Sequence, residues 1–355
     1  MPELDFSIVD AHIHLWDPRT TPRAVSPLVQ QLGHSPELLV KEARANFPPP
    51  IRAFLGVPDA LLFPYLPADH ARDAAAFPVD TVVHIEAGWM DHAPLAAADE
   101  TRWVASLFGA VGTQLGAIVA YADLRAENCD ALLAAHVEAS QKVRGVRQMA
   151  AHHPDPSIFN WNALPNLLRD AAFLRGFERL EARGLRFDAF VYSNQLADVG
   201  ALAQRFPKVP IVLDHVGTPV GAAGPVNDVA QSDAECERIR ASWRDELAKL
   251  AEHKNVWVKL SGLTMPILGF GFHRRPSPPS VDELHDALGP YLRHALDVFG
   301  VERSFFASNF PMDRPSAPYE RIFEAYLRCA QERGPSAPRV LLRDNALRFY
   351  GIESA

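Results

Sequence analysis

The sequence has few cysteines and no long apolar run. Its three cysteines, Cys129, Cys236 and Cys329, are far apart among 355 residues, and no CxxC pair occurs. This spacing excludes a disulfide framework and a cysteine zinc site. No window of about 18 uninterrupted apolar residues is present, and the N-terminus lacks a basic segment followed by an apolar one. We therefore expect no membrane span and a cytoplasmic protein.

Positive charge is also scarce. The chain has 35 Lys and Arg residues against 43 Asp and Glu residues, which gives a formal net charge of −8 at pH 7. Because nucleic-acid binding favours a basic patch and the cations here are scattered, we expect no nucleic-acid partner. A hydrophobic content of 48% and a charged content of 22% are typical of a soluble globular protein. We expect a small-molecule substrate, and a homo-oligomer stays open.

Eight apolar segments alternate with helical patterns. The predicted strands cover residues of about 7–15, 81–87, 115–121, 145–149, 186–192, 210–217, 256–263 and 304–309. Spacings of roughly 30 to 45 residues after the first connection indicate βα units and a parallel sheet. No GxGxxG follows the first strand, which disfavours a dinucleotide-binding fold. The sequence therefore predicts one α/β domain over residues 1–355, a (β/α)8 TIM barrel.

A long, proline-rich connection separates the first two predicted strands. It covers about residues 17–80, includes the run Pro48–Pro50, and contains a short predicted helix at 36–44. Segments of this length between strands are unusual and are often functional. We expect an insertion that acts either as a lid or cap or as a packing element.

The first strand carries two histidines in an apolar context. His12 and His14 are two residues apart, so their side chains point to the same face of a strand. Buried histidines are costly without partners. Since active sites of TIM barrels lie at the carboxyl ends of the strands, the pair predicts a site that grips either one metal ion or a substrate group.

Five segments resemble a known family. The stretch Val9–Trp16 is similar to the opening of the amidohydrolase superfamily, and the matching segments 145–148, 213–219, 258–263 and 307–313 follow in family order. The chain most resembles the amidohydrolase-related (amidohydrolase 2) branch that includes sugar lactonases and 2-pyrone-4,6-dicarboxylate lactonase. The resemblance implies a (β/α)8 barrel and hydrolysis of a lactone ring.

Further candidates lie at the other strand ends. In such relatives the histidine corresponding to His215 polarises the carbonyl or binds metal. Arg147 is placed to grip a substrate carboxylate with its forked guanidinium, or to form a structural salt bridge. The expected substrate-binding residues, each of which also has a structural alternative, are Glu86, Arg147, Asn309, Lys259 and Trp89.

The eighth strand departs from the family pattern. The superfamily usually places an aspartate there, as general base and often as metal ligand, whereas this chain has Asn309. An amide cannot accept a proton at neutral pH and is a weak ligand for a hard cation. Asp313, four residues on, or one of the histidines would then be the base. One divalent ion, zinc or manganese, held by His12 and His14 remains an option beside a metal-independent site.

Three functions are compatible with these residues. The first is a hydrolase in which water attacks a lactone carbonyl. Asp313 or a histidine removes the proton, and His12, His14 and His215, with or without a metal ion, stabilise the oxyanion. The second is a metal-dependent decarboxylase or hydratase of the same branch. The third is a barrel that binds a small ligand without catalysis, because the strand-eight aspartate is missing.

Overall fold

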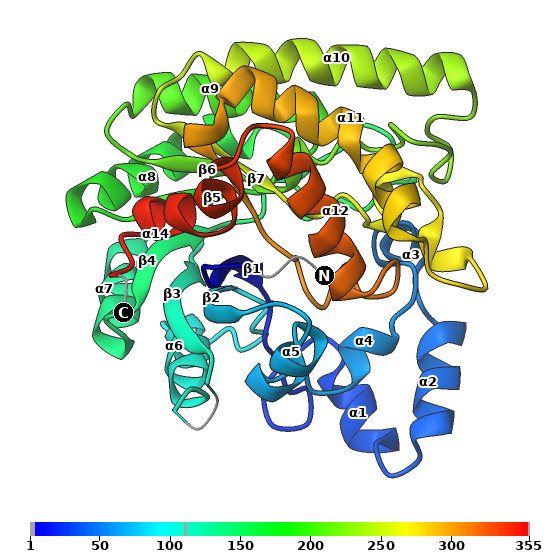
Figure 1. Ribbon diagram of the computed structural model, residues 1–355. Helices are drawn as coiled ribbons and strands as arrows, with labels where there is room; N and C mark the ends of the chain where they lie inside the picture. Colours follow the sequence, from blue (N-terminus) through cyan, green and yellow to red (C-terminus); the bar gives the residue numbers. More distant parts are fainter. Residues whose placement is uncertain (1–3, 110–111, 354–355) are drawn as a thin grey trace.

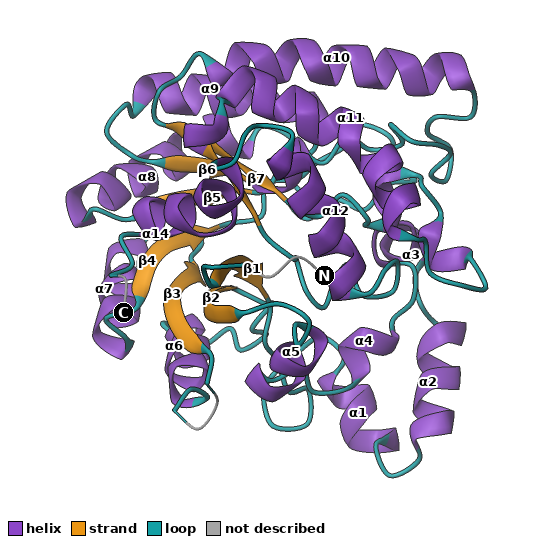
Figure 2. Cartoon of the chain, in the orientation of Figure 1, coloured by secondary structure: helices purple, strands orange, loops and turns teal. Residues whose placement is uncertain are grey.

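The computed structural model describes residues 4–109 and 112–353, and its centre is an eight-stranded sheet. The strands follow one another in sequence order, and each neighbouring pair from β1 to β8 is parallel. Figure 2 shows the strands at the centre with helices around them. The predicted (β/α)8 TIM barrel is confirmed. The strands are β1 Ile8–Ile13, β2 Val79–Ile85, β3 Gln114–Tyr121, β4 Val143–Arg147, β5 Arg186–Ala189, β6 Ile211–Leu213, β7 Val256–Leu260 and β8 Ser304–Phe306.

The outer helices follow the strands. The α-helices are α6 Ala97–Ser106, α7 Cys129–Ala139, α8 Ala171–Arg183, α9 Leu196–Arg205, α10 Asp233–Ala251, α11 Val281–Phe299, α12 Tyr319–Gln331, α13 Ala337–Arg339 and α14 Asn345–Tyr350. A π-helical segment, Val340–Asp344, joins the last two. Short 3-10 turns lie at Leu167–Arg169, Ser193–Gln195, Asp214–Gly217, Pro266–Leu268, Phe272–Arg274 and Val301–Arg303. No helix in the described ranges has the length and apolarity that a membrane crossing needs.

Local sequence signals set several boundaries. The Asp170 carboxylate caps α8 by accepting from the N–H groups of Ala172 and Phe173 at 2.9 and 3.0 Å. Gly184 ends the same helix with φ 64°, as its sequence position predicts. All the predicted strands except the third end earlier than expected, and four of them end three or four residues early, at Ala189, Leu213, Leu260 and Phe306. The residues beyond these ends belong to the loops that carry the candidate site.

A bulge in β1 aims its two histidines into the barrel. Asp10 pairs with Val82 and Ile13 pairs with His84, so β1 has one more residue than β2 in this interval. Such a bulge interrupts the alternation of side chains. Asp10 consequently contacts the helix layer, whereas His12 contacts Lys259 of β7 inside the barrel.

Backbone hydrogen bonds close the barrel between β1 and the segment after β8. The N–H of Asn309 donates to the carbonyl of His12 at 2.9 Å, and the N–H of His14 donates to the carbonyl of Phe310 at 2.8 Å. The backbone of Asn309 turns into the left-handed region there, with φ 59°. Closure therefore fixes the strand-one histidines and Asn309 side by side.

The buried Asp10 carboxylate ties this seam to two helices. Its Oδ1 accepts from the N–H of Ser308 at 2.9 Å. Its Oδ2 lies 2.9 Å from Nε2 of His70 and accepts from the Tyr319 hydroxyl at 3.2 Å. The motif residue Asp10 thus positions the strands that carry the site.

The long connection after β1 folds as five helices. They are α1 Ser26–Leu32, α2 Pro36–Ala45, α3 Pro49–Leu55, α4 Asp59–Leu62 and α5 Pro67–Asp73, and α2 matches the helix expected at 36–44. In Figure 1, α1, α2, α4 and α5 lie together on one side of the barrel, away from α8, α9 and α10. Backbone hydrogen bonds between Trp16 and Tyr65, 3.1 and 2.9 Å long, hold the connection against the end of β1.

Candidate active site

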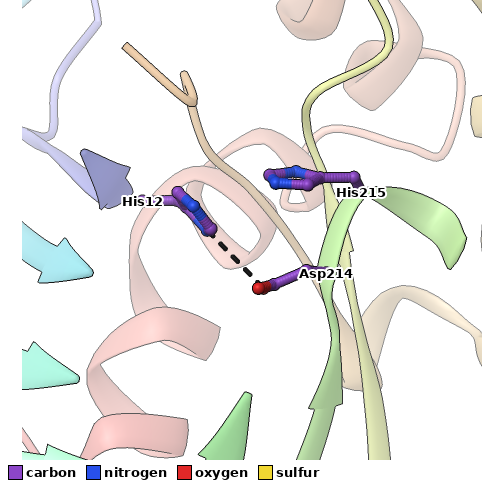
Figure 3. A group of neighbouring side chains, drawn as sticks. All are labelled: His12, Asp214 and His215. Carbon is purple, nitrogen blue, oxygen red and sulfur yellow. Dashed lines mark ion pairs between the residues drawn. The ribbon is translucent and has the colours of Figure 1, made fainter. Parts of the chain in front are cut away.

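The carboxyl ends of β1 and β6 bring three histidines and an aspartate together. Nε2 of His12 lies 3.2 Å from Nε2 of His14, and the rings of His12 and His215 have centroids 4.6 Å apart. Asp214 Oδ1 is 3.5 Å from Nδ1 of His12, the contact drawn in Figure 3. The backbone of His215 is left-handed, with φ 54°, which ends β6 and turns the imidazole toward His12. All four side chains are buried.

These imidazoles are neutral at pH 7. Burial, together with the Arg147 guanidinium, lowers the pKa of His14 to about 3. Burial also lowers the pKa of His215 to about 3, although Asp214 opposes the shift. Burial and the Lys259 ammonium lower the pKa of His12 well below its usual range. Neutral imidazoles can each bind a metal ion or accept a hydrogen bond.

Hydrogen bonds orient the histidine rings. Nδ1 of His14 lies 3.0 Å from the Ile85 carbonyl and must donate to it, which leaves Nε2 as the acceptor. The Lys259 ammonium donates to Nδ1 of His12 at 3.1 Å. With its proton on Nε2, His12 can donate across the 3.2 Å to His14. Nδ1 of His215 pairs with the Ser261 hydroxyl at 2.9 Å, so its Nε2 is available.

Beneath the histidines lies a buried charge cluster. The Lys259 ammonium is 2.5 Å from Asp188 Oδ2 and 3.1 Å from Asp214 Oδ1. Tyr350 donates to Asp188 at 2.8 Å. Burial raises the pKa of Asp188 to about 6, against the effect of Lys259. Burial also acts to raise the pKa of Asp214, but Lys259 and His12 hold it well below its usual range. Lys259 therefore keeps Asp214 ionised next to the histidines.

Arg147 is paired with Glu86. Its Nε donates to Glu86 Oε1 at 2.8 Å, and its second terminal nitrogen donates to the Glu86 carbonyl at 2.9 Å. The other terminal nitrogen lies 3.5 Å from Asp214 Oδ2 and 3.5 Å from Nε2 of His12. The sequence allowed Arg147 either to bind a substrate carboxylate or to form a structural salt bridge, and the structure contains the salt bridge. Both residues also line the cavity described below, and their contact with substrate stays a prediction.

Asp313 lies one layer behind Asn309. Its Oδ1 accepts from the Thr264 hydroxyl at 2.5 Å, and its Oδ2 makes no well-formed hydrogen bond with a described residue, although the Asn309 side chain is near enough to act on its pKa. Burial raises the pKa of Asp313 to about 7, although the hydrogen bond from Thr264 opposes the shift. Asn309 lines the cavity, and its Nδ2 makes no well-formed hydrogen bond within the described ranges. Asp313 itself is not a lining residue, and its role as base stays a prediction.

A cavity of about 640 Å³ opens over these strand ends. His14, Glu86, Arg147, His215 and Asn309 form its polar part. The insertion after β1 supplies another wall, made of Arg23, Ala24, Val25, Phe47, Pro48, Ile51, Phe54, Leu55 and Leu61. The segment expected as a lid or cap is therefore part of the cavity itself.

Two predicted substrate contacts lie outside the cavity lining. Trp89 packs against the Arg23 guanidinium, 5.3 Å from its ring centroid, and Lys259 lies in the charge cluster under His12. Sequence reasoning missed Asp188 and Asp214 as site residues. A signal existed for both: Asp214 directly precedes His215, and Asp188 interrupts an apolar strand.

A parallel eight-stranded barrel with a histidine pair after its first strand and a histidine after its sixth defines a TIM-barrel protein of the amidohydrolase type. The chain belongs to the amidohydrolase family, whose model, described as "Amidohydrolase", matches residues 9–352.

Similar proteins span most of the chain. The uncharacterized protein y4mH of Sinorhizobium fredii is 31% identical over 348 residues, which cover 98% of this chain and 99% of that protein. An L-fucono-1,5-lactonase of Burkholderia multivorans is 30% identical over 287 residues, which cover 79% of this chain and 87% of the lactonase. A crystal structure of a Burkholderia multivorans amidohydrolase with bound zinc is 26% identical, with a TM-score of 0.69, and the match covers 98% of this chain and 100% of that one.

The donor set fits one divalent ion. Ligand atoms of His12, Asp214 and His215 lie within 4.8 Å of one another. Both Asp214 oxygens lack a well-formed hydrogen bond with any described residue, although Lys259 is close. Once Nε2 of His12 has lost its proton, the 3.2 Å between the Nε2 atoms of His12 and His14 also matches two nitrogen ligands about 2.0–2.1 Å from one zinc ion.

Proposed function

We propose that this chain is a lactonase that hydrolyses the ester bond of a cyclic substrate. The observation that carries the proposal is the group of buried, neutral histidines beside Asn309 at the floor of the cavity. The L-fucono-1,5-lactonase of Burkholderia multivorans, 30% identical over 79% of this chain, adds support.

In this proposal water adds to the ring carbonyl carbon, and the ring C–O bond then breaks. The released alkoxide takes up a proton, so that the product is a hydroxy acid. Asp313, which lies behind Asn309 and does not line the cavity, receives the proton of the attacking water through a relay at the cavity floor. Its pKa of about 7 suits a general base, whereas His14 and His215, each with a pKa of about 3, are weak bases. Its Oδ2, which makes no well-formed hydrogen bond with a described residue, can hold that proton behind Asn309.

Negative charge develops on the carbonyl oxygen during the attack. In the proposed mechanism Asn309 donates to it from Nδ2, which has no well-formed hydrogen bond to any described residue. Arg147 adds positive charge at the same floor, where burial strengthens electrostatic interactions. In this proposal Asn309 stabilises the oxyanion, a role that differs from that of the aspartate usually found at this position. When bound, a divalent ion held by His12, His14, Asp214 and His215 would supply Lewis-acid polarisation of the carbonyl.

A lactone panel tests the proposal. Purified protein is mixed with five- and six-membered lactones, and acid release is followed with a pH indicator above the spontaneous rate. His215→Ala serves as the matched inactive variant, because His215 lines the cavity floor. We expect enzyme-dependent ring opening that the variant loses. The absence of ring opening with every lactone, including those with apolar substituents, would refute the proposal.

A further inference from the structure

The cavity wall is strongly apolar. Eighteen of the 24 lining residues have apolar side chains or none, and six are polar or charged. Five of the six polar residues lie at or just beyond the carboxyl ends of β1, β2, β4, β6 and β8, where the proposed reaction takes place. The part of a substrate that extends away from the reacting carbonyl therefore meets an apolar surface.

Methionines are concentrated at this wall. The chain has five methionines, and the four beyond residue 1, namely Met90, Met149, Met265 and Met312, all line the cavity. Methionine is flexible and polarizable and makes favourable contacts with aromatic rings. These four residues come from separate loops, so the chain places its few methionines at one surface.

Aromatic rings complete the wall. Trp161 lies edge-on to Phe159 and Phe54, with ring centroids 5.0 and 5.1 Å apart. Phe54 belongs to α3 of the insertion, whereas the other two rings belong to the connection between β4 and α8. A flat or bulky apolar group finds both faces and edges of rings here, which is the geometry that aromatic pairs favour.

Each arginine of the cavity has an acidic partner, although the second terminal nitrogen of Arg23 has no hydrogen-bond partner among the described residues. Arg23 donates to Glu100 at 2.6 Å, and Arg147 donates to Glu86 at 2.8 Å. A carboxylate on the substrate body would have to compete with Glu86 or Glu100 for these guanidinium groups, and it would be buried beside their negative charge. A polyhydroxylated body would lose hydrogen bonds to water, and each buried hydroxyl without a partner would weaken binding roughly 5- to 100-fold.

We infer, on the basis of the proposed function, that the substrate is a lactone with an uncharged apolar body, aromatic or bulky alkyl, rather than a sugar lactone or a pyrone dicarboxylate. The cavity of about 640 Å³ is large enough for such a body beside the lactone ring. The polar floor holds the ester, and the methionine and aromatic wall selects the substituent.

Two matched pairs of lactones test this inference through kcat/KM. γ-Phenyl-γ-butyrolactone is compared with γ-butyrolactone, and δ-valerolactone is compared with D-glucono-1,5-lactone. We expect the phenyl group to raise kcat/KM roughly 10- to 100-fold, the effect of burying one aromatic side group. We also expect the unsubstituted six-membered ring to be opened faster than its polyhydroxylated counterpart, after correction for spontaneous hydrolysis.

A variant pair locates the effect. Phe159→Ala removes a ring of the wall, whereas Leu38→Ala, at a residue of α2 that is 40% exposed and outside the lining, is the control. Phe159→Ala should lower kcat/KM for the phenyl lactone, mainly through KM, by a larger factor than for γ-butyrolactone, whereas Leu38→Ala should change neither value. Equal losses on both lactones, or faster opening of the sugar lactone than of δ-valerolactone, would overturn the inference while the lactonase proposal stands. If no lactone is opened, the lactonase proposal itself fails, and the inference fails with it.

Discussion

Replacing Lys259 by methionine tests the charge cluster under the site. Lys259 is fully buried, and its ammonium lies 2.5 Å from Asp188 and 3.1 Å from Asp214. Methionine fills a similar volume without the charge, so the change leaves two buried carboxylates without the ammonium that they share. Breaking a buried pair by removing one partner costs about 3–5 kcal/mol.

The size of the thermal effect follows from the chain length. With an unfolding entropy of about 2.1 cal/mol/K per residue, 355 residues give about 0.75 kcal/mol/K. A loss of about 3–5 kcal/mol therefore lowers the midpoint of thermal unfolding by about 4–7 °C. Calorimetry or circular dichroism on the purified variant measures this shift.

Two further measurements separate charge from packing. Protonation relieves an unpaired carboxylate, so the loss of stability should be smaller at pH 5 than at pH 8. The double variant K259M/D188N removes one of the stranded carboxylates and should be more stable than K259M alone, by about 1 kcal/mol or more.

Lys249→Met on α10 is the matched control, because this exposed lysine pairs with Glu246 on the surface and should change stability by less than about 0.5 kcal/mol. If Lys259→Met is no more destabilising than Lys249→Met, or if its effect does not depend on pH, the carboxylates do not need the buried ammonium and the reasoning is wrong.

Three other changes probe the floor of the cavity. Because burial raises the pKa of Asp313 to about 7, activity should rise with pH through about 7, and Asp313→Asn should abolish that limb of the pH–rate profile. The raised pKa also makes stability depend on pH, because the folded protein holds the Asp313 proton more tightly than the unfolded chain does. The stabilising contribution is complete below about pH 4 and is lost as the pH rises to about 7. Urea titrations should show a weaker pH dependence of the unfolding free energy in Asp313→Asn. Asn309→Ala should lower kcat roughly 100- to 1,000-fold with little change in folding, and an unchanged kcat would exclude an oxyanion contact. Gly262→Ala places a methyl group 2.5 Å from the His215 ring and should reduce activity, whereas Gly184→Ala, with a similar φ but open space around it, should cost about 1–2 kcal/mol of stability and leave activity intact.

Apolar periodicity was sufficient to find the strands but not their ends. Strands buried on both faces are continuous apolar runs, so all eight were predicted. The predicted sixth strand extended to Gly217, yet the left-handed backbone at His215 and Val216 ends β6 at Leu213. A left-handed valine is unfavourable in isolation and persists because the surrounding barrel holds it. Such a conformation depends on tertiary contacts that local sequence does not encode.

The proximity of two candidate residues was predicted correctly where both lie at the end of one strand. His12 and His14 were expected on one face by period-two alternation, and they do lie together. The bulge that separates them from Asp10 was not visible, because it depends on the register with β2. The cluster of Asp188, Asp214 and Lys259 joins three strands across the barrel interior, and spacing along a single chain carries no information about such a meeting.

The polar floor of the cavity comes from the strand ends, whereas much of its apolar wall comes from the insertion. This difference explains why the sequence predicts the candidate catalytic residues more readily than the substrate. The register of a closed sheet fixes where the strands end. The order of the strands in the sequence is therefore enough to place His12, His215 and Asn309 at the same end of the barrel. The residues that the insertion contributes to the cavity wall are not fixed by the register of the sheet. Phe47, Ile51 and Phe54 recur at spacings of four and three residues, the pattern of an ordinary helix face that packs on a core. They contribute to the cavity wall because the pairing of Trp16 with Tyr65 fixes both ends of the insertion against the barrel mouth. An insertion that is held at its ends can change the residues of this wall without disturbing the register of the barrel. Substrate choice can therefore diverge between relatives that keep the same floor.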